Sequence, residues 1–356
     1  MASAGINFEG LTPQNGALRD LAELIFLQLT EEDKLNTVIT FMTGQQNGKK
    51  LGIVGRGGLH GRKASGCDPV YDNDQIPVSE KTWVMAAWEI AESICYADLA
   101  DTIANHMAVN GTDKADLTDT YYMDNIVKPY FEQAIIDLIF RYVFFGDTEA
   151  EGTLKDGVSA ESFNLIDGIW KQVFEGVAAK KITRVKIAAN DAASISAQYE
   201  AMKQTGAATD VLDELLLLTP AGLRKLKGRT FYVTQAFADL LSRDIQKSNK
   251  GSDLQWESIF AGIQKTQYQG VDLIALPQWD EIIQLYLKNS TNAEAYDKPF
   301  RVLYTAKDNL RAGTESQEAI ADLRVWFEKK DKRNYLYAED TLGALLLSEE
   351  YTAVAY

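Results

Sequence analysis

The longest regular pattern of hydrophobic and polar residues runs from Asp116 to Asp147. Its apolar residues recur three and four positions apart, which is the period of one face of an α-helix. They stand at positions 123, 126, 127, 130, 131, 134, 135, 138, 139, 142 and 143. Pro129 lies inside this pattern, so the helix must either kink there or begin again with Pro129 in its first turn. Gly146 ends the pattern, and we predict a long helix over residues 118–145.

Shorter patterns predict a mixture of helices and strands along the rest of the chain. Helical spacing of apolar residues is found at 17–29, 30–41, 94–107, 163–173, 192–202, 211–218, 219–226, 235–245 and 279–287. β-Branched and aromatic residues indicate strands within 78–91, at 183–188, 229–234, 271–276 and 300–306, and within 320–328, 334–339 and 341–351. These elements together predict an α+β fold.

A glycine-rich stretch with basic side chains lies between Gly44 and Gly66, where eight of 23 residues are glycine. The composition suggests phosphate binding, but the known motifs fail. No two glycines stand at the P-loop spacing before Lys-Ser or Lys-Thr, and His60 occupies the place of the third glycine in a dinucleotide motif that begins at Gly55. What remains is either a solvated loop or a contact for an acidic surface of a neighbouring chain. Its candidate contact residues are Lys49, Lys50, Arg56, Arg62 and Lys63.

The charge of the chain limits its partners. With 36 Lys and Arg against 51 Asp and Glu, the net charge is −15, so sequence-specific binding of DNA or RNA is not expected. The charge is compatible with a protein that encloses nucleic acid without binding it tightly. No window is apolar enough to span a membrane, and the N-terminus lacks the pattern of a signal peptide. Cys67 and Cys95 are expected to be free thiols.

The chain carries no recognisable catalytic, metal or cofactor motif. His60 and His106 are its only histidines, and no H-E-x-x-H, C-x-x-C, EF-hand or G-x-S-x-G pattern accompanies them. Neighbouring carboxylates such as Glu349 and Glu350 are unavoidable among 51 acidic residues, so they do not indicate acid–base chemistry. We therefore predict no catalytic residue, no bound metal and no cofactor. A structural or assembly protein is favoured over an enzyme.

The order of segments from residue 81 onward resembles the major capsid protein of tailed bacteriophages, which has the Hong Kong 97 capsid fold. In that family an N-terminal arm leads to a long hairpin, the E-loop, and a strand, a short helix and a long spine helix follow. The corresponding segments here are 81–91 (strand), 98–107 (short helix), 121–145 (spine), 144–148 (FFGDT, the end of the spine), 163–173 (exit to the A-domain), 229–241 (central A-domain strand and helix), 269–277 (next strand) and 334–356 (last P-domain strands).

This resemblance implies a division of the chain into parts. They are an N-terminal arm with helices (1–42), the E-loop (43–80), a P-domain (81–165) with its spine helix (118–145), an A-domain (166–312) and returning P-domain strands (313–356). The five basic residues of the E-loop become candidates for contact between subunits. The residues that represent the spine helix are Tyr122, Ile126, Tyr130, Ile135, Leu138 and Tyr142.

The resemblance also implies a function, which stands here as an expectation. Copies of the chain would assemble as hexamers and pentamers into the icosahedral shell of a virion, in the cytoplasm of a bacterial host, and would enclose double-stranded DNA. Portal and scaffolding proteins are the expected partners, with decoration proteins where the shell carries them, and no membrane is involved. An encapsulin-type compartment shell is the alternative with the same fold. A cytosolic enzyme is the alternative from another class.

Two features of the family are not carried over. Some members crosslink an E-loop lysine to an asparagine near the C-terminus of a neighbour. Lys49, Lys50 and Lys63 could supply the lysine, but no asparagine follows Asn334. Other members begin with a long scaffolding segment that is later removed, and we expect scaffolding here to be a separate protein.

Overall fold

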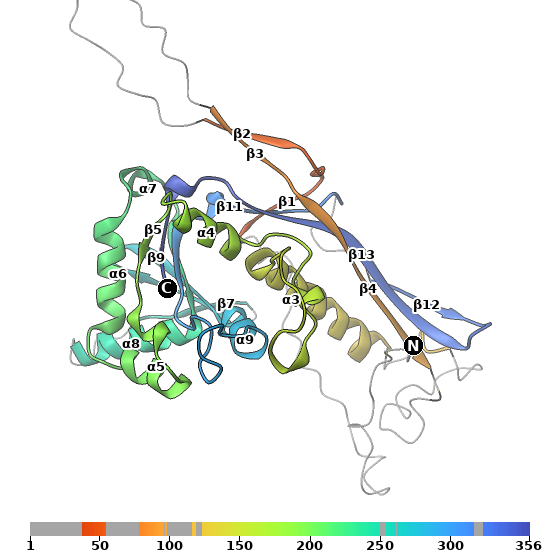
Figure 1. The fold of residues 1–356 in the computed structure, drawn as a ribbon. Helices are drawn as coiled ribbons and strands as arrows, with labels where there is room; N and C mark the ends of the chain where they lie inside the picture. Colours follow the sequence, from red (N-terminus) through yellow and green to blue (C-terminus); the bar gives the residue numbers. More distant parts are fainter. Residues whose placement is uncertain are drawn as a thin grey trace, which may run out of the picture.

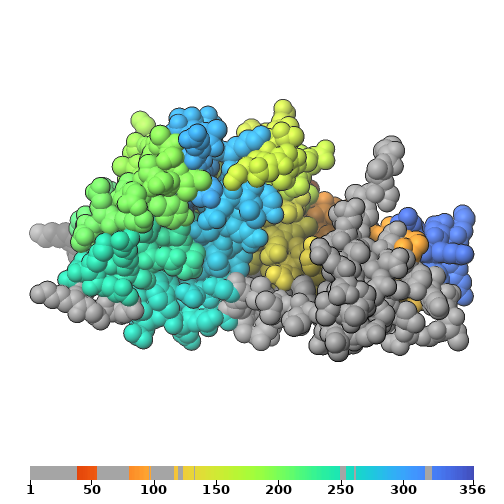
Figure 2. Space-filling model, turned by 90° about the horizontal axis from the view of Figure 1, so that it is seen from below, coloured from red at the N-terminus to blue at the C-terminus, as the bar shows by residue number. Residues whose placement is uncertain are grey.

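A computed structural model describes residues 38–54, 78–95, 97, 116–118, 123–248, 254–260, 262–316 and 323–356. Over these residues the molecule is elongated. Figure 1 shows a wide sheet with helices at one end, a long narrow sheet that runs to the other end, and the helix α3 alongside the narrow sheet. Figure 2, seen from below, shows the green and cyan middle of the chain at one end and part of the dark blue C-terminal region at the other. The two sheets therefore organise opposite ends of one long body.

The wide sheet separates two hydrophobic cores. Within the described residues it has seven strands, in the order β5 (Thr183–Val185), β14 (Thr352–Ala355), β10 (Val302–Ala306), β6 (Arg229–Thr234), β9 (Val271–Leu276), β8 (Ile263–Tyr268) and β7 (Glu257–Phe260). Successive side chains of a strand point to opposite faces. On β10, Val302 and Tyr304 enter one core and Leu303 enters the other. Every residue of β10 is buried, so its sequence is nearly continuously apolar.

Helices cover both faces of this sheet, and each group shares a core with the strands beneath it. The helices on one face are α5 (Ile195–Met202), α6 (Ala207–Leu218) and α8 (Gln235–Ser248), with the short α7 (Ala221–Lys225) after α6. The helices on the other face are α3 (Lys128–Phe145), α4 (Ile169–Ala178) and α9 (Pro277–Leu285). The apolar stripes of these helices therefore meet alternate residues of the same strands.

Two of the helices are capped by carboxylates from neighbouring helices. The residue before α6 is Gly206, which has no side chain to cap it, and the amide of Ala208 donates to Asp244 of α8 over 2.8 Å. The start of α8 is capped in turn by Asp280 of α9, which accepts from the amides of Gln235 and Ala236. A carboxylate satisfies free amides at a helix N-terminus and complements the helix dipole. These contacts fix the three helices relative to one another.

The narrow sheet is built around one long strand. Within the described residues its strands are β1 (Thr40–Met42), β11 (Leu310–Gly313), β13 (Arg333–Leu346), β12 (Arg324–Glu328) and β4 (Met85–Cys95). The first part of β13 pairs with β4 on one side and β12 on the other, and its last residues pair with β11. Because β13 is 14 residues long, it carries the chain from the far tip of the molecule back to the wide sheet (Figure 1).

The long helix begins later than the sequence pattern predicts. Residues 116–118 are not helical, and a π-helical turn from Met123 to Val127 precedes α3, whose first residue is Lys128. Pro129 lies in the first turn of α3, where its missing amide hydrogen costs nothing. Of the two possibilities for Pro129, the helix begins again there. Its end at Phe145, before Gly146, is as predicted.

Other element predictions have mixed outcomes. The strands at 229–234 and 271–276 are confirmed, but the helix predicted at 163–173 begins only at Ile169. The helix predicted from Ile94 is wrong at its start, since Ile94 and Cys95 end strand β4 and pair with β13. Strand β14, assigned to the returning P-domain strands, pairs with β10 and β5 of the wide sheet. The domain boundaries themselves stay a prediction.

Candidate functional site

The segment predicted as an E-loop opens with a two-stranded hairpin. Strand β2 (Lys50–Val54) pairs antiparallel with β3 (Val78–Thr82). Lys50 forms an ion pair with Glu80 at 2.7 Å, and the Lys49 ammonium donates to the Gln45 side chain at 3.1 Å. An exposed ion pair contributes little to stability, so Lys50 could exchange Glu80 for a carboxylate of another chain. The other three candidate residues lie outside the described residues: Arg56, Arg62 and Lys63.

One tryptophan anchors this hairpin to the narrow sheet. Trp83 follows β3, is fully buried, and clusters with Met85 and Leu345. The backbone of Trp83 also bonds to Gly48 and Lys49, at 2.9 Å each. Its ring needs the space beside two glycines: a Cβ at Gly313 would lie 3.0 Å from the ring, and a Cβ at Gly343 would lie 3.1 Å from it. This aromatic ring therefore holds the base of the hairpin, and it fits there because Gly313 and Gly343 have no side chains.

A charged contact adds a second attachment. Lys81 of β3 pairs with Glu349 at 2.6 Å, and both side chains are half-buried. Burial has the largest single effect and opposes ionisation of Glu349. The hydrogen bond from Lys81, a backbone hydrogen bond and the positive charges of Lys81 and Lys181 together outweigh it, so the pKa of Glu349 lies below its ordinary value. Glu349 stands in the turn that leads into β14. The hairpin is thereby tied to the wide sheet as well as the narrow one.

The residues predicted to represent the spine helix separate into inner and outer positions. Ile135, Leu138 and Tyr142 are buried in the core between α3 and the sheets. Ile126 is half-buried and stands in the π-helical turn. Tyr130 is 56% exposed and meets the Phe131 ring edge-on at 5.3 Å. The sixth residue, Tyr122, lies outside the described residues.

The C-terminal end of α3 contacts the segment that precedes α4, and a glycine stands on each side of this contact. The amide of Gly168 donates to the carbonyl of Gly146 at 2.8 Å, and that of Gly146 donates to Tyr142 at 3.1 Å. A Cβ at Gly168 would lie 2.7 Å from the Gly146 nitrogen and 2.9 Å from the Tyr142 oxygen. Only glycine fits where two backbones approach this closely. Beside this crossing, Lys171 binds the carboxylates of Asp147, Glu149 and Asp167 at 2.5, 3.1 and 3.3 Å.

A buried arginine lies beside the same crossing. Arg301 is 1% exposed, pairs with Asp297 at 2.9 Å, and packs among the rings of Phe145, Trp170 and Phe174 at 5.1–5.5 Å from their centres. It borders a cavity of about 210 Å³. Its charge is balanced by Asp297, and its cation–π contacts link α3 and α4 to the residue that directly precedes β10. We interpret this cluster as structural.

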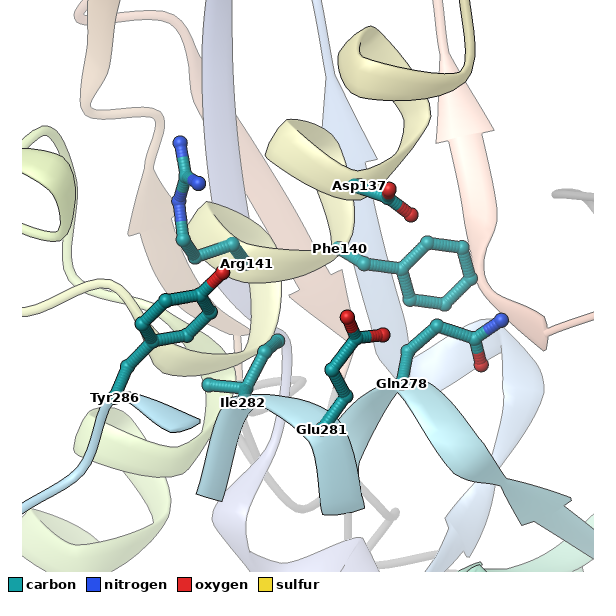
Figure 3. Close-up of a pocket in the computed structure, with 7 residues that line it drawn as sticks. All are labelled: Asp137, Phe140, Arg141, Gln278, Glu281, Ile282 and Tyr286. Atoms are coloured by element: carbon teal, nitrogen blue, oxygen red, sulfur yellow. The ribbon is translucent and has the colours of Figure 1, made fainter. Parts of the chain in front are cut away.

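A polar cleft separates α3 from α9. Figure 3 shows Asp137 on α3, and Gln278 and Glu281 extending toward it from α9. The cleft that they line has a volume of about 60 Å³. The cleft raises the pKa of Asp137 to about 6, first because it removes water from the carboxyl group and then because Glu281 adds negative charge. Arg141 offsets this only in part, since its guanidinium points away from both carboxylates in Figure 3 and lies 5.7 Å from the Phe163 ring.

The raised pKa of Asp137 predicts a pH-dependent effect of substitution. A carboxyl group whose folded-state pKa lies above its unfolded value favours the folded state when protonated, and this advantage is lost as pH rises from about 4 through 6. Asp137→Asn removes the charge, so it should stabilise the fold at neutral pH by about 1 kcal/mol, a figure reduced for screening by solvent. At about pH 4 the gain should vanish. Thermal unfolding at both pH values checks this, and equal gains at both would contradict it.

Other kinds of site are not found among the described residues. In this part of the chain no three His, Cys, Asp or Glu side chains gather to hold a metal ion. None of the helices described here is long and apolar enough to cross a membrane. His60 and His106 both lie outside these residues. The prediction that the chain has no catalytic, metal or cofactor residues stays a prediction.

Comparison with known proteins identifies the fold. No family model and no curated protein matches the chain. Similar solved structures include one described as Gordonia phage Cozz (TM-score 0.52, 12% identity, covering 97% of this chain and 91% of that one). The capsid of an empty GTA particle has a TM-score of 0.51 at 12% identity, with 96% and 94% covered. A chain of the satellite phage P4 procapsid has a TM-score of 0.50 at 12% identity, and the match covers 90% of this chain and 92% of that one. The chain has the α+β Hong Kong 97-type capsid fold, as the order of its segments predicted.

Proposed function

We propose that this protein is the major capsid protein of a tailed phage, and that its copies assemble into an icosahedral shell around double-stranded DNA. The observation that carries the proposal is the extent of the structural match: capsid structures cover at least 90% of this chain and are themselves covered to at least 91%. All parts of the chain would therefore take part in building the same shell, including the arm, the hairpin, the long helix and both sheets. We further propose the boundaries given above for the arm, E-loop, P-domain and A-domain.

The shape of the chain supports a role in assembly. The hairpin β2–β3 projects from the body beyond the end of the narrow sheet (Figure 1), where it can reach another subunit. Extended segments laid over neighbours bury more area than compact faces do, and symmetry repeats each contact many times. Lys49 and Lys50 would bring positive charge to a chain whose net charge is −15, which favours contact with an acidic surface of the next copy.

The net negative charge of the chain is also compatible with the packaging of DNA inside the shell. DNA carries a dense negative charge, so an acidic inner wall would repel it weakly and let it slide during packaging. An inner surface found to be strongly basic would contradict this. We expect hexamers and pentamers of this chain to form in the cytoplasm of the bacterial host, with portal and scaffolding proteins as partners and with decoration proteins where the shell carries them.

Negative-stain microscopy of the purified protein, with sedimentation velocity, tests the proposal. Closed shells of uniform diameter are expected. A chain that remains a monomer up to its solubility limit would count against any shell function. Particles recovered from infected cells give the second test: nuclease-resistant double-stranded DNA inside them supports a phage head, whereas a protein cargo without DNA contradicts it.

A further inference from the structure

The end of α6 and the start of α7 form a corner with an unusual exposed surface. Leu217 and Leu218 are 77% and 48% exposed, although Leu215 on the same helix is fully buried. Single exposed leucines are common, but two adjacent ones at the edge of a molecule are a candidate contact. Figure 1 shows α6 and α7 at the edge of the molecule opposite β12. We call residues 210–227 the α6–α7 corner.

Charged residues of opposite sign flank the two leucines. Asp210 and Glu214 precede them on the exposed side of α6, and exposed basic residues follow on and after α7. These basic residues are Arg224, Lys225 and Lys227. Within the described residues, none of these five charged side chains forms an ion pair. The corner therefore presents an acidic flank, an apolar centre and a basic flank in that order.

The corner is held in shape before any partner binds. The guanidinium of Arg224 donates to the carbonyls of Leu216 and Leu217 at 2.7 and 2.8 Å, which closes the C-terminal end of α6. Gly222 lies so close to Tyr351 that an added Cβ would be 2.6 Å from the ring. This contact fixes α7 against the turn before β14. A preformed surface loses little conformational entropy when it binds.

We propose that the α6–α7 corner binds a second copy of this chain, with the acidic flank of one copy against the basic flank of the other and the leucines packed between them. The partner must offer an apolar patch between opposite charges, and the corner itself has this character. Such a surface is complementary to its own copy, and its paired charges fix the orientation. The inference rests on the proposed self-assembly and names one contact that it uses.

Two sets of variants test the contact by sedimentation velocity over a range of concentrations. The double variant Leu217→Asp with Leu218→Asp should weaken association at least tenfold. Its matched control is Leu285→Asp, since Leu285 is also 48% exposed but lies on α9; it should associate like the wild type. Glu214→Lys and Lys225→Glu should each weaken association, and the two together should restore it, because the opposite charges again meet between copies.

The outcomes separate this inference from the proposed function. The inference is overturned if the wild type associates and the leucine variant associates equally well. It is also overturned if the charge-reversed double variant associates no better than its single variants, or if Leu285→Asp weakens association as much as the leucine variant does. If the wild type forms shells and the leucine variant does too, the proposed function stands and the inference fails. If the wild type forms only small oligomers that the leucine variant lacks, the inference stands and the shell does not. A wild-type chain that stays monomeric overturns both.

Discussion

Replacing Gly168 with alanine should destabilise the protein by about 3 kcal/mol or more, enough to lower the yield of soluble protein when it is expressed. A Cβ there would lie 2.7 Å from the backbone nitrogen of Gly146 and 2.9 Å from the carbonyl oxygen of Tyr142. These are backbone atoms at the end of α3, so they cannot rotate away as a side chain could. Gly146→Ala should behave alike, since its Cβ would lie 2.6 Å from the Tyr142 oxygen and would overlap the carbonyl of Ile166.

Gly52→Ala is the matched control for this prediction. A Cβ at Gly52, in strand β2, meets no atom within 4 Å, and its backbone is not in the left-handed region. The measurement is the yield of soluble protein together with the midpoint of urea unfolding. The control should match the wild type in both. Soluble Gly168→Ala protein with an unchanged midpoint would show that the two segments do not cross as described.

Local sequence signals account for much of the fold. Arg229–Thr234 was predicted as a strand at its observed bounds, because aromatic and β-branched residues stand between Gly228 and a helical pattern. The end of α3 was predicted from Gly146. The long helix, the strand–helix order and the turn before β9 all follow from neighbours within a few positions. The order of these segments was sufficient to identify the fold, although the identity to known structures is 12%.

The remaining features depend on contacts between distant residues, which no local pattern contains. The pairing of β14 with β10 and β5 joins the last strand to segments far earlier in the chain, so the pattern could not show that it leaves the narrow sheet. Trp83 has no sequence signal as an anchor, because its role comes from the space beside Gly313 and Gly343. The candidate basic residues were chosen by composition alone. Three of those five remain outside the described residues, and their role stays a prediction.

Because Trp83 anchors the hairpin, the stability of the hairpin is separate from that of the main body. Trp83 belongs to a small cluster with Met85 and Leu345, separate from the two large cores on either side of the wide sheet. Regions with few apolar contacts open independently of the main body. The hairpin can therefore be released while the sheets stay folded, so its contribution to assembly can be measured apart from that of the fold.

Trp83→Ala should release the hairpin and abolish shell formation while leaving the main body folded. Truncating a fully buried tryptophan costs about 3–5 kcal/mol, more than the half-buried Lys81–Glu349 ion pair, the other attachment of the hairpin, can offset. Hydrogen exchange should rise at residues 48–54 and 78–83, and microscopy should show no shells. Val84→Ala is the matched control, since Val84 is the next residue and is 66% exposed; it should assemble normally. Normal shells from Trp83→Ala, with increased exchange confirmed in the hairpin, would mean that assembly does not need an anchored hairpin.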